Sequence, residues 1–430
     1  MANLLEKASI LITPTAYDNG SINAIKPKES PFGDLDFTRA TSGSVVGTAN
    51  RQNANGVLEE VAQNVPRIDY LGGEGHWLIE PQSTNLVTYS DELSQVSEWV
   101  KIGFATVNNN QAIAPTDTLI ADEVLSGDNS ALNGLRIDKS VVSGDDYTFS
   151  FFAKKKDTDT NYVAIRFDSF NSAFSLKRAW FNIDSGNLGT VESGITAKIE
   201  DYGDGWYRCS ATQTATATAS SRVLMMLTSD DNVSSLGIGL GFYGFGGQFE
   251  QQSYATSYIP TSGSQVTRAE DGFGLNTTLD TSLINSTEGT FYVEMAALVD
   301  DQTNRAVSLS EGNDNNTIRV RFENGGSNRI RLDNKTQSGN NSQFRTTDYN
   351  ILNFSKIAVR FKENDCVCFV NGTEVIATVG GSTGATYLAD TLTKIKSTRG
   401  DSSFKFAGKL KCIAVFKEGL TDSELTCLTT

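Results

Sequence analysis

Short runs in which apolar and polar residues alternate recur along most of the chain. Because every second side chain of a strand lies on the same face, such alternation predicts strands with one buried face. Clusters of Gly, Asn, Asp and Ser separate the runs, as turns of antiparallel sheets require. The pattern therefore predicts an all-β fold of antiparallel β-sandwiches. The clearest runs are residues 147–156, 162–170, 206–218, 222–229, 289–299, 317–325 and 354–379.

Helical periodicity is almost absent, and the best candidate is "LTDSELTCL" at residues 420–428. Thr421 or Asp422 could cap one turn there, because each side-chain oxygen can accept a hydrogen bond from the free backbone N–H groups of the first turn. We therefore expect one short helix in this segment.

The pattern divides the chain into three parts. Residues 1–86 have no sustained alternation and hold five of the seven prolines, which indicates an extended N-terminal arm. Residues 87–268 form a first predicted sandwich, and residues 269–430 form a second. The polar stretch at residues 260–274 is the predicted hinge between them.

Composition narrows the range of partners. The 430 residues carry a formal net charge of -15. Such a surface repels phosphate backbones and anionic lipids, so we expect neither nucleic-acid binding nor membrane insertion. The first residues lack a basic segment before their apolar run, and no apolar window approaches the length of a membrane span. We therefore expect the protein to be made and folded in a cytoplasm.

The five cysteines do not have the spacing of a zinc site. Cys366 and Cys368 are two residues apart in a predicted strand, so their side chains share one face. We interpret both as small core residues. The odd number of cysteines also argues against a framework of disulfides.

The only histidine, His76, lies beside Trp77 and close to Glu80. A general base needs an oriented partner and a substrate cleft, and a lone histidine cannot supply several metal ligands. The sequence contains no G-x-S-x-G motif and no Glu-x-Asp-x-x-Glu strand of the kind that concanavalin-like glucanases use. We interpret His76 as part of a structural strap, and we expect no catalytic residues, no metal ligands and no enzymatic activity.

Sugars are bound by aromatic faces together with polar side chains. Aromatic side chains also fill sandwich cores, and for each candidate the core interpretation is favoured; Trp206 and Tyr207 are adjacent on one strand, so one of the two should face outward. The candidate glycan-binding residues are Trp99, Trp180, Tyr202, Tyr207 and Tyr243.

Acidic loops could hold a structural calcium ion. They lack the ligand spacing of an EF-hand, and we interpret them as solvated loops. No cofactor is expected. The loops are residues 229–232, 311–316 and 422–425.

Two stretches resemble signatures of bacteriophage and prophage structural proteins. The second is "QFEQQSYATSYIPTSGSQVTRAED" at residues 248–271. The first has a Phe-x-Arg start, a Gly-(Val/Leu)-(Ile/Leu)-Glu turn, a Pro-Arg-(Ile/Phe)-(Asp/Asn)-Tyr centre and a Glu-Pro-Gln-x-Thr-Asn-Leu close. Its matching residues here are Phe37, Arg39, Gly56, Glu59, Pro66, Arg67, Asp69, Tyr70, Glu80, Pro81, Gln82, Thr84, Asn85 and Leu86.

Each predicted sandwich has a further likeness. The first resembles the jelly rolls of carbohydrate-binding modules, through "DGWYRCSAT" and "LGIGLGFYGFGGQFEQ". The second resembles concanavalin A-like, laminin-G-type lectin domains, through residues 354–375 and 406–428. Within it, Asn371-Gly372 suits a type I′ hairpin turn, which needs positive φ at both central residues.

These resemblances imply a virion structural protein, of the head-fibre or tail-fibre type, made in the bacterial host cytoplasm. They imply that the N-terminal arm contacts other virion proteins of the capsid or tail, that the chain forms a homotrimer, and that the sandwiches bind host or environmental glycans. Two alternatives stay open. One is a tailspike-type glycan depolymerase, which the missing paired carboxylates disfavour, and the other is a purely architectural capsid decoration protein.

Overall fold

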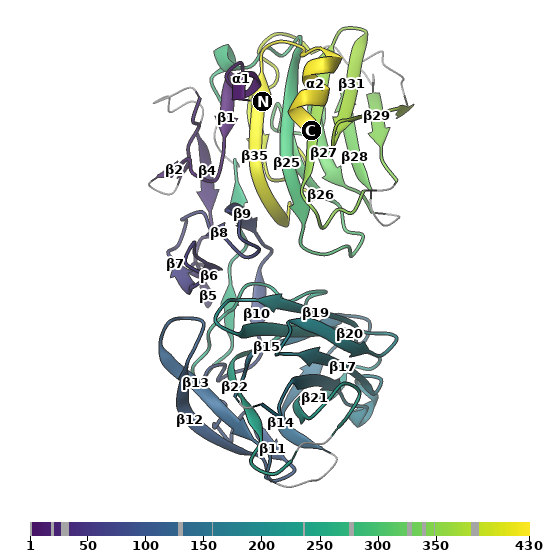
Figure 1. Ribbon diagram of the computed structural model, residues 1–430. Coiled ribbons are helices and arrows are strands. Elements are labelled where there is room, and N and C mark those ends of the chain that lie inside the picture. The colour runs from purple at the N-terminus through teal and green to yellow at the C-terminus, as the bar shows by residue number, and fades with distance from the viewer. Residues whose placement is uncertain are drawn as a thin grey trace.

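The computed structural model describes residues 2–18, 21–26, 34–127, 132–156, 158–234, 237–274, 279–324, 329–337, 341–347, 349–379 and 387–430. The chain folds into two β-sandwiches placed end to end, with a smaller strand-rich segment beside the junction (Figure 1). Both chain ends lie on the second sandwich. The predicted all-β class with antiparallel sandwiches is confirmed.

The first sandwich consists of two six-stranded sheets that enclose one apolar core. One sheet has the order β11 (Val100–Ile102), β14 (Asn133–Val141), β21 (Ala219–Thr228), β16 (Tyr162–Phe167), β17 (Lys177–Asn182) and β18 (Asn187–Val191). The other has the order β12 (Thr106–Ile113), β13 (Leu119–Leu125), β22 (Gly241–Glu250), β15 (Asp146–Lys155), β20 (Trp206–Thr214) and β19 (Thr196–Asp201).

The second sandwich packs an eight-stranded sheet on a six-stranded sheet. The larger sheet has the order β32 (Thr373–Val375), β31 (Asp365–Val370), β30 (Ser355–Lys362), β25 (Gly289–Ala297), β35 (Gly408–Phe416), β9 (His76–Ile79) and β8 (Ile68–Asp69), with β1 (Ile10–Ile12) also on β35. The smaller sheet has the order β33 (Ala377–Val379), β29 (Asn341–Arg345), β28 (Ile330–Lys335), β27 (Thr317–Phe322), β26 (Arg305–Ser310) and β34 (Lys394–Lys396).

Short strands near the junction complete the fold. They form the sheets β2 (Tyr17–Asp18), β3 (Ser21–Ile22), β4 (Leu35–Thr38) and β24 (Gly272–Phe273); β10 (Ser83–Asn85), β23 (Val266–Arg268) and β5 (Val45–Val46); and the hairpin β6 (Ala49–Gln52) with β7 (Leu58–Val61). The helices are α1 (Ala2–Leu5) and α2 (Asp422–Thr429), with 3-10 turns at Phe170–Ser172 and Thr281–Leu283. Among the described residues, no helix has the length and apolarity needed to cross a membrane.

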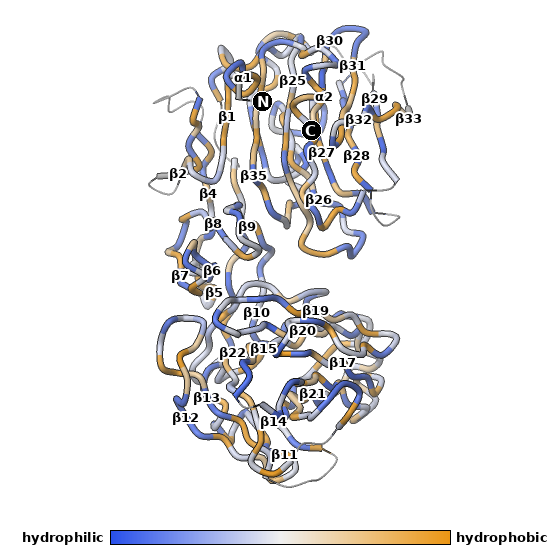
Figure 2. The backbone as a smooth tube through the Cα atoms, viewed as in Figure 1, coloured by the Kyte–Doolittle hydropathy of each residue, from blue (hydrophilic) through white to orange (hydrophobic). Residues whose placement is uncertain are grey.

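Local sequence explains many of these elements. In β27, Ile318, Val320 and Phe322 enter the core, while Arg319 and Arg321 point away from it. Hydrophilic and hydrophobic positions accordingly alternate along many strands of both sandwiches (Figure 2).

Three specific predictions are confirmed in the second sandwich. Thr421 caps α2 and forms a reciprocal capping box with Glu424. Asn371 and Gly372 both have positive φ in the turn between β31 and β32. Cys366 and Cys368 are free thiols buried in the core.

The segment expected to be an extended arm, residues 1–86, is instead largely built into the second sandwich. β1 pairs with Ile413–Val415 of β35, and β9 pairs with Gly408–Leu410 along the same edge. The hydrogen-bonding edge of β35 would otherwise be unpaired, which explains why such short strands are held. Ile10, Ile12 and Trp77 also enter the core of the second sandwich.

A buried ionic cluster joins these parts. Arg39 donates to Asp271 at 2.9 Å, Arg67 lies 2.8 Å from Glu80 and also contacts Asp271, and Arg268 lies 3.3 Å from Glu80. All five side chains are at most 3% exposed. They come from both signature stretches, so residues far apart in the sequence form one structural unit.

The three arginines exceed the two carboxylates by one charge, and backbone carbonyls accept several of the remaining hydrogen bonds. Arg39 donates to the carbonyl oxygens of Gly47 and Ala62, each at 2.7 Å, and Arg268 donates to the carbonyl of Pro81 at 2.9 Å. These hydrogen bonds matter, because a buried charge without partners destabilises the folded state.

We predict that Asp271→Asn lowers the free energy of unfolding by roughly 3–5 kcal/mol, because it leaves Arg39 and Arg67 buried without their shared carboxylate. Chemical denaturation measures the change. Asp138→Asn is the matched control, since Asp138 pairs with Arg136 on the surface, and it should change stability by no more than about 1 kcal/mol. Equal effects of the two substitutions would show that the cluster does not hold the junction.

Candidate functional site

A cavity of about 440 Å³ lies between the two sandwiches, next to the ionic cluster. β19 and β20 line it from the first sandwich, and Leu298, Leu352 and Lys409 line it from the second. Asp69 and Glu80 line it from the segment between them. The cavity therefore exists only because the three parts are held together.

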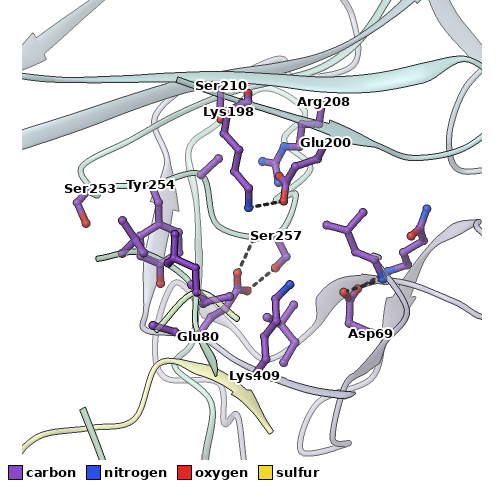
Figure 3. A pocket seen from close by; sticks show the side chains of 18 of the residues that line it. Asp69, Glu80, Lys198, Glu200, Arg208, Ser210, Ser253, Tyr254, Ser257 and Lys409 are labelled. Carbon is purple, nitrogen blue, oxygen red and sulfur yellow. Dashed lines mark hydrogen bonds and ion pairs between the residues drawn. The ribbon is translucent and has the colours of Figure 1, made fainter. Parts of the chain in front are cut away.

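Several charged side chains are directed toward the same space (Figure 3). Lys198 pairs with Glu200 at 2.6 Å, and Glu80 accepts from the Ser257 backbone at 2.8 Å and from the Ser257 hydroxyl at 2.7 Å. Lys409 differs, because its ammonium makes no hydrogen bond or ion pair with any residue that the structure describes. Burial, together with the nearby charge of Lys198, lowers the pKa of Lys409.

Two tyrosines also line the cavity. The Tyr254 hydroxyl is buried and lacks a hydrogen-bond partner among the described residues. Burial raises its pKa, so the group is a neutral donor. The Tyr202 ring packs edge-on against Phe152, with centroids 4.8 Å apart. Lys409 thus offers an unpaired ammonium group to a ligand, beside apolar contacts from Leu298 and Leu352, whereas the Tyr254 hydroxyl is covered by protein.

Glycoside cleavage needs a protonated acid, and two carboxyl groups of the cavity, those of Glu80 and Glu200, are poorly suited to that role. Burial acts to raise the pKa of Glu80, but Arg67, Arg268 and the Ser257 hydrogen bonds outweigh it and lower the pKa to about 2. Lys198 similarly holds the pKa of Glu200 below its usual range despite burial. Burial raises the pKa of Asp69, yet its oxygens already accept from the backbone of Gln52 and Leu71.

The sequence-predicted aromatic residues do not gather at one site. Trp99 and Trp180 are at most 1% exposed, and their indole N–H groups donate to the carbonyls of Tyr89 and Val233. Protein covers both rings, so no sugar can stack on them. The prediction that Trp99 and Trp180 bind glycans is therefore wrong, and both are buried packing residues. Along β20, Tyr207 faces the core of the first sandwich, and Trp206 lies on the opposite face, where a second apolar cluster covers it to 2% exposed.

The three candidate tyrosines have different surroundings. Tyr202 alone lines the cavity. Tyr207 and Tyr243 are half-buried against two separate apolar clusters of the first sandwich. Sequence reasoning missed Lys409 and Tyr254, because nothing local indicates that residues from β35 and from the loop after β22 meet.

His76 lies in β9 and is 1% exposed. Its Nδ1 is 2.9 Å from the Glu74 carbonyl, and its ring meets Phe354 edge-on at 5.7 Å. Burial and the charges of Lys409 and Lys411 lower the pKa of His76 to about 4. The imidazole is neutral at pH 7 and has a packing role.

The loops considered for calcium use their carboxylates internally. Asp231 accepts from the Thr190 N–H and hydroxyl, Asp314 pairs with Arg319, and Asp422 pairs with Arg360. Among the described residues, no group of three His, Cys, Asp or Glu side chains forms a metal site.

No protein-family model and no curated protein sequence matches the chain. Among solved structures, the CBM40 of the Ruminococcus gnavus IT-sialidase, bound to alpha2,3 sialyllactose, is similar over 34% of this chain and 84% of its own, with 13% identity and a TM-score of 0.29. The Streptococcus pneumoniae NanB sialidase is similar over 35% of this chain and 25% of its own, with 17% identity and a TM-score of 0.29. A SAP-like pentraxin from Limulus polyphemus is similar over 34% and 71%, with 9% identity and a TM-score of 0.28. Likeness at this level assigns no ligand or activity to this chain.

We predict that His76 makes stability depend on pH between about 6.5 and 4. Its folded-state pKa is below its ordinary value of 6.5, so the stability is complete above pH 6.5 and is lost as pH falls toward 4. The slope should be at most about 1.4 kcal/mol per pH unit. Denaturation of His76→Gln at several pH values should show a flatter profile in this window. An unchanged profile would show that His76 is not kept neutral by the fold. Glu80 acts separately, with loss between pH 4.5 and about 2.

Proposed function

We propose that this chain is a structural protein of a bacteriophage virion, a head-fibre or tail-fibre type appendage that binds glycans without cleaving them. The observation that carries the glycan-binding part is the cavity between the sandwiches, with its unpaired Lys409 ammonium group.

The virion part of the proposal is supported by the two signature stretches. Their likeness to phage structural proteins is a likeness of sequence, and the structure assigns several of the matching residues a structural role. Arg39, Arg67 and Glu80 from the first stretch meet Arg268 and Asp271 from the second. The residues that carry the resemblance are therefore those that hold the junction.

The cavity suits a hydroxyl-rich ligand. Its volume lies within the roughly 300–1,000 Å³ of typical small-molecule sites. Its lining holds four cationic side chains and four carboxylates, so no strong charge preference arises. They are Arg51, Lys198, Arg208 and Lys409, with Asp69, Glu80, Glu200 and Asp300. The Lys409 ammonium beside leucine side chains matches the polar and apolar faces of a sugar ring.

Binding without cleavage is favoured over the tailspike alternative because Glu80 and Glu200 both have lowered pKa values and so are ionised at neutral pH. Residues 1–86 are not a free attachment arm, since β1 and β9 are paired with β35. Contact with the capsid or tail would use another surface, and the homotrimer stays an expectation of the resemblance.

We predict that Lys409→Met weakens glycan binding by roughly tenfold or more, because it removes a charged donor from the cavity. Purified protein, single and clustered on beads, is applied to a glycan array. Clustering should raise the apparent affinity through avidity. Lys411→Met is the matched control, since Lys411 lies two residues along β35 and pairs with Glu74 outside the cavity. Equal loss in both variants, or release of reducing sugar by the wild-type protein, would contradict this proposal.

We further predict that the chain is present in purified phage particles. Mass spectrometry of particles from an induced host should detect it, and antibody labelling in electron microscopy should locate it on the head or tail. Labelled particles that bind no glycan would favour the architectural role. Absence of the chain from particles would overturn the virion part while leaving glycan binding open.

A further inference from the structure

A row of arginines crosses the outer face of the smaller sheet in the second sandwich. Arg321 of β27 lies directly opposite Arg331 of β28, and Arg331 lies directly opposite Arg345 of β29. Like charges in directly opposed positions destabilise a sheet. The fold could place neutral residues there at no cost to the core, because these side chains point away from it.

Carboxylates hold the row together but do not neutralise it. Glu323 accepts from Arg331 at 2.6 Å and lies 2.7 Å from Arg345, and Asp333 lies 2.7 Å from both Arg319 and Arg331. Among the described residues, the connected network has six cations and four carboxylates. It comprises Arg319, Arg321, Arg331, Lys335, Arg345 and Arg399, with Asp314, Glu323, Asp333 and Asp401.

Two lysines of β34 extend the positive face. The Lys396 ammonium donates to the carbonyls of Gly312 and Gly400, each at 3.1 Å, and Lys394 lies on the same face of its strand. The chain as a whole carries a net charge of -15. A face with surplus positive charge on such a protein favours the approach of an anion at this position.

The cations are graded from buried to accessible. Arg321 is largely covered and stacks on Phe404, with its guanidinium carbon 5.2 Å from the ring centroid. The side chains of Lys335 and Arg345 are 31% and 35% exposed. The covered arginine fixes the row, and the exposed pair can reach a ligand.

We propose that this face binds a carboxylated polysaccharide, with Arg345 and Lys335 as its accessible contacts. The guanidinium group is a planar fork that matches a carboxylate, and Arg345 already shows this geometry by contacting both oxygens of Glu323, through Nε at 2.7 Å and Nη2 at 3.0 Å. Neighbouring strands are about 4.8 Å apart, so the row presents repeated cations to a polymer that carries repeated acids. The glycan nature of the ligand rests on the proposed function, whereas the acidic selectivity rests on this face.

The test uses the full chain with three soluble polymers in a biosensor assay. These are polygalacturonate, which carries carboxylates, dextran sulfate, which carries sulfates, and neutral dextran. Polygalacturonate should bind, dextran should not, and raising the salt from roughly 50 to 200 mM should weaken binding because exposed ion pairs are screened. The double variant Arg345→Gln with Lys335→Gln should weaken it roughly tenfold.

Matched controls separate this proposal from a general charge effect. Arg136→Gln with Lys362→Gln removes the same two charges from a face of the first sandwich and from β30, where the side chains pair with Asp138 and Glu288. This control should bind polygalacturonate as the wild-type protein does, and both variants should keep their thermal unfolding temperature.

Failure of this inference and failure of the proposed function give different experimental results. Binding of array glycans that Lys409→Met abolishes, with no retention of polygalacturonate, would overturn this inference alone. Equal binding of dextran sulfate and polygalacturonate, or equal loss in the control variant, would also overturn it. Loss of polygalacturonate binding in the Arg345 and Lys335 variant alone supports it.

Discussion

The structure depends on five charged side chains buried where the two sandwiches meet. Arg39, Arg67 and Arg268 surround Glu80 and Asp271, and all five side chains are at most 3% exposed. Burial of such a group is favourable only if every charge is paired or hydrogen-bonded. These side chains come from three segments, one with Arg39, one with Arg67 and Glu80, and one with Arg268 and Asp271. Each segment is therefore fixed in register, since a shift of one residue would leave a charge unpaired.

The cavity follows from this constraint. Its walls come from β19 and β20, from β35, and from the segment that carries Asp69 and Glu80. Glu80 belongs both to the ionic cluster and to the cavity wall, so the relative position of the sandwiches and the shape of the cavity are set by the same side chain.

The sequence predicted the elements that depend on local pattern. Alternation located β15, β20 and β27, and the turn chemistry of Asn371-Gly372 and the cap at Thr421 depend only on near neighbours. It failed for residues 1–86, because strands of three or four residues have too little alternation to detect. β1 and β9 exist because β35, more than 300 residues away, offers an unpaired edge. The cavity residues Lys409 and Tyr254 were missed for the same reason, since only long-range packing brings them together.

The two charged clusters show how burial decides the role of an arginine. Around Asp271 the arginines are fully enclosed and their surplus charge is satisfied by backbone carbonyls, so nothing remains for a ligand. On the outer face of the second sandwich the same residue type grades from the covered Arg321 to Arg345, which is 35% exposed. Burial, which outweighs the attraction of Asp333, lowers the pKa of Arg321 to about 10 with the help of Arg331 and Arg319. An external anion relieves the mutual repulsion of these arginines. The free energy that the repulsion costs without a ligand therefore adds to the affinity for an anionic ligand.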